Sequence, residues 1–130
     1  MNTKDENIPV SPTRSELEIL QVLWERGPST VREVNNELIM QREVNYTTTL
    51  KQMQLMAEKG MLDRAENQMK HVYTAALDEQ ETKAKLLKKF VDSTYKGSAA
   101  SLVMQLLGNE NTSPQDLQDI KEMIKKLEDQ

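Results

Sequence analysis

The chain contains the same helix-start signal twice, and this repeat sets its organisation. Glu16 follows Thr13 by three residues, and Glu33 follows Thr30 by the same distance. This is the spacing of a capping box, in which each side chain bonds the backbone N–H of the other residue. Apolar residues at helical spacing follow each pair. We therefore predict a helix from Thr13 to the RGPS segment and a second helix from Thr30 to about Met40.

A third helix is predicted between Asn45 and Gly60, and it begins with three consecutive threonines. Asn45 is a suitable N-cap, and Gly60 is a suitable residue to end the helix. Threonine is β-branched and poor in helix interiors, but the first turn tolerates it. The helical spacing is expected to turn Thr49 toward the core, and Thr47 and Thr48 outward.

Two short β-strand candidates follow the third helix. Met61–Ala65 and Lys70–Ala75 are separated by Glu66–Met69, in which Asn67 suits a hairpin turn. Three helices followed by a hairpin is the order of a winged helix-turn-helix, in which the hairpin is the wing. We therefore predict a mainly α fold with a small β-hairpin, in which an N-terminal winged helix-turn-helix is followed by a C-terminal helical dimerisation region.

The sequence changes character after Leu77, where three further helices are predicted. Their apolar side chains exceed what three short helices can cover, so we expect them to pack against the same helices of a second chain. The expected domains are a disordered lead over residues 1–11, a winged-helix DNA-binding domain over 12–77 and a helical dimerisation domain over 78–130. The expected dimerisation residues are Leu86, Leu87, Phe90, Val91, Leu102, Val103, Leu106, Leu107, Leu117, Ile120, Ile124 and Leu127.

Composition excludes several classes of function. The chain has no cysteine and one histidine, which excludes disulfides and thiolate metal sites and leaves no ligand cluster for zinc or copper. No apolar run approaches the roughly 20 residues of a membrane span, and the polar N-terminus lacks a signal-peptide segment. No nucleophile lies near a base, and no phosphate-binding loop is present. We expect a cytoplasmic protein that is not an enzyme, with no cofactor, no metal and no membrane insertion.

The outward face of the third helix is the candidate DNA-reading surface. Helix-turn-helix proteins place the first turns of the second helix of the pair in the major groove. Threonine, lysine and glutamine side chains can contact base edges there. A merely solvated face would show the same polar pattern, so the helix order and the wing are what favour DNA. The residues on this face are Thr47, Thr48, Lys51 and Gln52.

The wing supplies a second group of DNA candidates. Arg64, Lys70 and His71 are placed to contact backbone phosphates. For His71, a partly exposed strand histidine without a specific role is the simpler interpretation. The net charge of −4 argues against nonspecific coating of nucleic acid but not against one basic face.

Four segments of the chain, taken together and in their order along the sequence, resemble those of one protein family. They are ELEILQVLWERGPSTVREV (Glu16–Val34), YTTTLKQMQLMAEKGML (Tyr46–Leu62), HVYTAAL (His71–Leu77) and GSAASLVMQLL (Gly97–Leu107). Together they resemble the penicillinase-repressor family of bacterial transcriptional regulators, the BlaI/MecI/CopY type. The similarity extends from about Pro12 to Leu127.

The resemblance implies a transcriptional repressor that binds a palindromic operator in double-stranded DNA as a homodimer. It extends the DNA-binding role to Tyr46, and it places Leu55 where relatives often have arginine. Some members respond to β-lactams through a membrane sensor and cleavage of the repressor, and copper-responsive members use cysteine ligands. The absence of cysteine excludes copper sensing by that route, and the absence of an Asn-Phe dipeptide leaves cleavage control without support. An upstream sensor or protease is therefore not identified. The alternative from a different class is a winged-helix module that binds another protein and not DNA.

Overall fold

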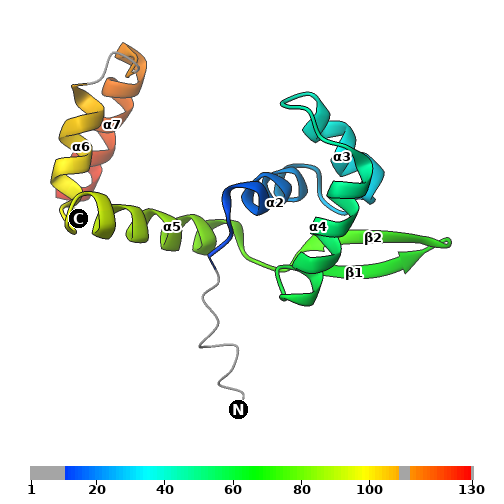
Figure 1. Cartoon of the computed structure of the whole chain (residues 1–130). Helices are drawn as coiled ribbons and strands as arrows, with labels where there is room; N and C mark the ends of the chain where they lie inside the picture. Colours follow the sequence, from blue (N-terminus) through cyan, green and yellow to red (C-terminus); the bar gives the residue numbers. More distant parts are fainter. Residues whose placement is uncertain (1–10, 109–111, 130) are drawn as a thin grey trace. The chain divides into compact units, whose positions relative to one another are not determined.

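The computed structural model of the protein describes residues 11–108 and 112–129. These residues form six helices and one antiparallel hairpin (Figure 1), which confirms the mainly α fold with a small β-hairpin. The chain divides into two compact units, of which the first ends at Lys85 and the second begins at Leu86. The division falls inside α5 (Glu79–Thr94). Except for Ser11, the predicted disordered lead lies outside the described residues.

Both predicted capping boxes are present. α2 (Arg14–Arg26) and α3 (Val31–Ile39) each follow a threonine that exchanges bonds with a glutamate three residues later. In the first box, the Thr13 N–H donates to Glu16 Oε1 at 2.9 Å, and the Glu16 N–H donates to Thr13 Oγ1 at 3.3 Å. Gly27 caps the C-terminus of α2, and its φ of 86° would strain a residue with a side chain. These local bonds explain why both helices begin where the sequence predicts.

α4 (Tyr46–Glu58) begins directly after Asn45, as predicted. The Asn45 Oδ1 atom accepts a hydrogen bond of 2.8 Å from the backbone N–H of Thr48, which satisfies one of the free donors of the first turn. Thr49 is buried, whereas Thr47 and Thr48 are exposed. The structure thus confirms that the three threonines have different environments.

β1 (Leu62–Asn67) and β2 (Lys70–Ala75) pair in antiparallel register, with Leu62 opposite Ala75 and Asn67 opposite Lys70. The predicted turn over Glu66–Met69 was too long, because β1 continues through Asn67. The turn consists of Gln68 and Met69, which have φ values of 52° and 66°. Positive φ at both central residues is the pattern of a type I′ turn, whose twist matches that of the two strands.

The core of the first unit lies between α2, α3, α4 and the hairpin (Figure 1). Ser29, just before α3, exchanges two backbone hydrogen bonds with Tyr73 of β2, at 3.0 and 2.8 Å. The Trp24 indole N–H donates to the Leu77 carbonyl at 3.0 Å, which holds the segment after β2 against α2. The buried apolar residues are Ile19, Leu20, Val22, Leu23, Val31, Val34, Leu38, Met53, Met56, Met61, Leu62 and Tyr73.

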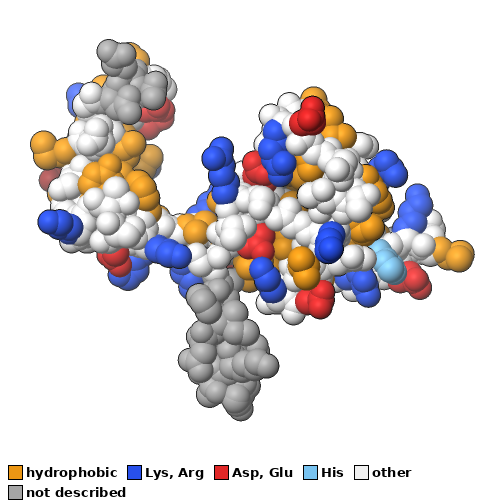
Figure 2. All heavy atoms as spheres, in the orientation of Figure 1, with side chains coloured by type: hydrophobic (Ala, Val, Ile, Leu, Met, Phe, Trp, Pro, Cys, Tyr) orange, Lys and Arg blue, Asp and Glu red, His pale blue; other side chains and the backbone are white. Residues whose placement is uncertain are grey.

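In the second unit, α6 (Ala99–Leu107) and α7 (Pro114–Glu128) begin after the serine caps Ser98 and Ser113. Neither helix contains a buried residue, and Figure 2 shows hydrophobic side chains on the surface of this unit. Among the described residues, no helix combines the length and the apolar character needed to cross a membrane. The large exposed apolar residues of α5, α6 and α7 are Leu87, Phe90, Val103, Met104, Leu106, Leu107, Met123, Ile124 and Leu127.

Candidate nucleic-acid interface

The outward face of α4 presents polar side chains from its first turn to its third. Thr47, Thr48 and Lys51 are exposed on it, as the helical spacing predicts. Gln54 and Leu55 continue the same exposed face, and Leu55 is 48% exposed. Sequence reasoning omitted Gln54, although its position three residues after Lys51 places it on the same side of the helix.

Gln52 lies at the edge of this face and is half-buried. Its amide nitrogen donates a hydrogen bond of 2.8 Å to the Ser15 hydroxyl at the start of α2. The side chain therefore holds α4 against α2 in this conformation.

Two polar contacts, each with at least one buried partner, fix α4 within the first unit. The Thr49 hydroxyl donates to Asn35 Oδ1 at 2.7 Å, which joins α4 to α3. The Lys59 ammonium, just after α4, lies 2.9 Å from the buried carboxylate of Glu16 on α2. Because buried polar groups are costly when unpaired, these contacts favour one orientation of α4 over others.

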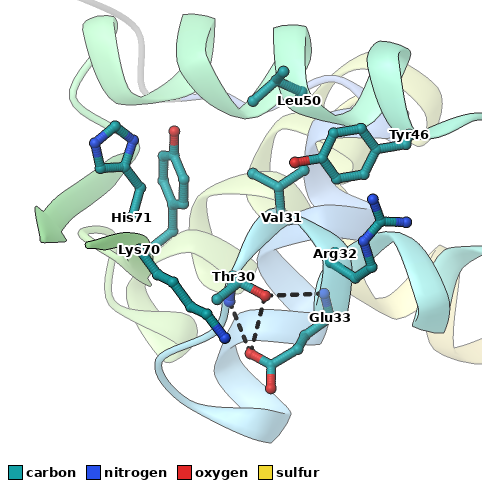
Figure 3. Close-up of a pocket in the computed structure, with 9 residues that line it drawn as sticks. Thr30, Val31, Arg32, Glu33, Tyr46, Leu50, Lys70 and His71 are labelled. Carbon is teal, nitrogen blue, oxygen red and sulfur yellow. Dashed lines mark hydrogen bonds between the residues drawn. The ribbon is translucent and has the colours of Figure 1, made fainter. Parts of the chain in front are cut away.

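A groove of about 500 Å³ opens between α3, the start of α4 and β2. Its apolar lining comes from Val31, Leu50 and Tyr73. Its polar lining combines residues from three separate elements (Figure 3). These residues are Thr30, Arg32, Glu33, Tyr46, Lys70 and His71.

The predicted site residues Tyr46, Lys70 and His71 meet in this groove, whereas Arg64 is not part of its lining. Arg64 is exposed on β1 opposite Tyr73. His71 is exposed, and its Nε2 atom lies 3.8 Å from a carboxylate oxygen of Glu66 on the opposite strand.

Sequence reasoning did not single out Arg32. Its guanidinium carbon lies 4.4 Å from the centre of the Tyr46 ring, within the range of a cation–π contact. The two residues belong to different helices, so no periodicity within one helix could have paired them.

One carboxylate, that of Glu33, lies in the groove, and it caps the start of α3. The Glu33 carboxylate accepts a hydrogen bond of 2.9 Å from the Thr30 N–H. This bond lowers the pKa of Glu33 despite some burial, and Arg26 and Lys70 act in the same direction. Glu33 is therefore an ionised capping group, which partly balances the charge of Lys70.

The first unit as a whole is not a strongly basic surface. Figure 2 shows lysine and arginine side chains around it, with acidic side chains between them. Within residues 11–108 and 112–129, no group of three His, Asp or Glu side chains is placed to hold a metal ion. Exposed cations lie at two places, Lys51 on the outward face of α4 and Arg32 and Lys70 at the groove beside it.

Comparison with known proteins adds an independent observation. The family model described as penicillinase repressor matches residues 12–126. The methicillin resistance regulatory protein MecI of Mammaliicoccus sciuri is 24% identical over 112 residues, which cover 86% of this chain and 91% of that protein. The penicillinase repressor of Staphylococcus aureus is 20% identical over 118 residues, with 91% and 94% covered. That of Bacillus licheniformis is 24% identical over 110 residues, with 85% and 86% covered.

Proposed function

The chain belongs to the penicillinase repressor family, and from this premise we propose that it represses transcription by binding a palindromic DNA operator as a homodimer. The relatives are named as repressors and regulatory proteins, so a regulatory role is the shared property. We assign it no catalytic role and place it in the cytoplasm, where bacterial DNA is accessible.

The exposed face of α4 is the observation that carries the DNA-binding proposal. In a winged helix-turn-helix, this helix enters the major groove with its first turns. Thr47 and Thr48 can bond base edges or contact a thymine methyl, and Lys51 can contact guanine or a phosphate. Their side chains are exposed, while the opposite side of α4 is packed into the core. The core therefore holds the helix in place while the exposed face is free to contact DNA.

The other predicted DNA residues contribute to different extents in this proposal. Lys70, His71 and Arg64 are exposed on the wing and are proposed to contact phosphates. Tyr46 is the first residue of α4 and is proposed to contact DNA at the entry of this helix. Gln52 receives the least weight, because its amide already donates to Ser15 and would have to leave that bond to reach a base.

The C-terminal helices support the homodimer. Leu106 is 49% exposed and Leu127 is 67% exposed within one chain, and single chains rarely leave so many apolar side chains open to water. We propose that α5, α6 and α7 pack against the same helices of a second copy. The two winged-helix units would then read the two halves of a palindrome.

Selection of bound sequences from random duplex DNA, followed by titration at several salt concentrations, tests the proposed function. The proposal expects enrichment of a palindrome whose half-sites lie about 10 base pairs, or a multiple of that, apart. It also expects affinity that falls steeply as salt rises. The absence of any enriched duplex, together with salt-insensitive capture of a protein partner, would favour the alternative of a protein-binding winged-helix module.

A further inference from the structure

The contact between Arg32 and Tyr46 joins the first turn of α3 to the first residue of α4. The guanidinium carbon of Arg32 lies 4.4 Å from the centre of the Tyr46 ring. Figure 3 shows the two side chains next to each other at the edge of the groove. Tyr46 is half-buried and Arg32 is exposed. Part of the tyrosine ring is therefore packed against the protein, while the guanidinium is accessible to a partner.

In the described part of the chain, no ion pair with a carboxylate involves Arg32. A guanidinium placed over an aromatic ring has five N–H donors, and those directed away from the ring stay available to a partner. Those donors match the oxygens of a phosphate, and the stacking limits the orientations they adopt.

The opposite wall of the groove is also basic. Lys70 and His71 project from β2, and both are exposed. Glu33 is the acidic residue in the lining; its carboxylate accepts a hydrogen bond from the Thr30 N–H and partly balances the charge of Lys70. Val31 and Leu50 give the groove an apolar part. Cationic edges around an apolar lining suit a sugar–phosphate segment, which is anionic at the phosphate and less polar at the sugar.

We propose that this groove holds one segment of the operator backbone and that Arg32 is both its phosphate contact and the positioning residue for Tyr46. By holding the Tyr46 ring, Arg32 would place the first turn of α4 at a constant distance from the bound backbone. The inference rests on the proposed function and deepens it, because it assigns a role to a residue outside the recognition helix and the wing.

The test is a double-mutant cycle on the full-length protein, with the duplex selected above as the probe. Arg32→Ala should weaken binding about tenfold, as expected for the loss of a charge-assisted bond. It should weaken binding to selected and random duplexes alike. Because the proposed dimer carries two copies of Arg32, the substitution should also reduce the salt slope by about 2. Arg32→Lys should keep the salt slope but lose part of the affinity. Lys125→Ala, which removes an exposed charge from α7, should change neither.

Variants of Tyr46 test the positioning role. Tyr46→Phe keeps the ring and should bind nearly as the parent does, whereas Tyr46→Leu should weaken binding. Combining Arg32→Ala with Tyr46→Leu should cost less than the product of the two single losses, because the same contact is removed twice. Circular dichroism melting of each variant establishes that the fold is retained.

The outcomes separate this inference from the function on which it rests. If Arg32→Ala changed neither affinity nor salt slope while Lys51→Ala still weakened binding, the groove proposal would be wrong and operator binding would stand. Independent effects of Arg32 and Tyr46 would overturn the positioning role. If the parent bound no duplex at any salt concentration, both proposals would fail.

Discussion

The hydroxyl of Thr49 donates a 2.7 Å hydrogen bond to Oδ1 of Asn35, and both side chains are buried where α3 meets α4. The bond explains why a residue with poor helix propensity occupies this position. A leucine or valine would satisfy the apolar surroundings but would leave the Asn35 oxygen without this donor.

Thr49→Val is therefore expected to lower the free energy of unfolding by about 1–3 kcal/mol, although the two side chains are similar in shape. Thr49→Ser keeps the donor and should cost less. Urea denaturation at one fixed protein concentration measures both, because the stability of the proposed dimer would depend on concentration. Equal losses in the two variants would contradict the role of the hydrogen bond.

The Glu16–Lys59 contact predicts how stability depends on pH. Burial of the Glu16 carboxyl acts to raise its pKa, but the hydrogen bond from the Thr13 N–H and the nearby Lys59 ammonium outweigh burial and lower the pKa overall. The folded state then binds fewer protons than the unfolded state. The contribution of Glu16 to the free energy of unfolding is complete above the ordinary carboxyl pKa and is lost as pH falls through the lowered pKa of Glu16.

Lys59→Met should accordingly flatten the fall in stability between about pH 5 and pH 3, and should cost about 1 kcal/mol at neutral pH because Lys59 is half-exposed. Lys51→Met is the matched control. Lys51 lies on α4, the helix that ends just before Lys59, and it is exposed and has no ion pair within the described residues. Thermal melting across this pH range measures both. A control that flattened the curve equally would indicate a general charge effect.

Met69 predicts a stabilising substitution at the tip of the wing. Its side chain is 94% exposed and its φ is 66°, a conformation in which a Cβ atom is unfavourable. Met69→Gly should stabilise the protein by about 0.5–1 kcal/mol relative to Met69→Ala, which keeps the Cβ atom. Comparison of the two melting temperatures measures the cost of a Cβ atom at this positive φ. A lower melting temperature for the glycine variant would contradict the prediction.

Thr48→Ala and Lys51→Ala should each weaken operator binding by about 1–3 kcal/mol if the contacts are to bases. Only Lys51→Ala should also reduce the dependence of affinity on salt, because threonine carries no charge. Fluorescence anisotropy with the selected duplex measures both quantities. Unchanged affinity in both variants would move the reading surface away from α4, most directly to the wing.

Leu106→Asp should disrupt the proposed dimer, since it places a charge among apolar side chains of α6. Gln105→Asp adds the same charge at a neighbouring exposed polar position and should have a smaller effect. Sedimentation velocity distinguishes monomer from dimer in both variants. An undisturbed Leu106→Asp dimer would show that α6 does not lie between subunits.

Signals that act over a few residues predicted most of the fold. Thr13, Thr30 and Asn45 start helices through bonds to backbone groups three residues away, and such bonds do not depend on the rest of the chain. The predicted hairpin turn was too long because Gln68 and Met69 both adopt positive φ, whereas glycine or asparagine usually marks such positions.

The sequence patterns did not predict the side-chain contacts between helices. Helical spacing placed Gln52 outward, but its bond to Ser15 depends on how α4 crosses α2. The stacking of Arg32 on Tyr46 depends likewise on how α3 meets α4. Such contacts are set by the packing of the whole unit, which one sequence does not display.

The two backbone hydrogen bonds between Ser29 and Tyr73 divide the hairpin into parts of unequal stability. Its root cannot open without removing the buried Tyr73 ring from the core, so that opening costs nearly as much as unfolding the whole unit. Beyond the root, the residues around Gln68 are exposed and have no buried side chain to hold them, so they can open at little cost. The tip of the wing can therefore adapt to an uneven surface while its base keeps a constant position beside α4.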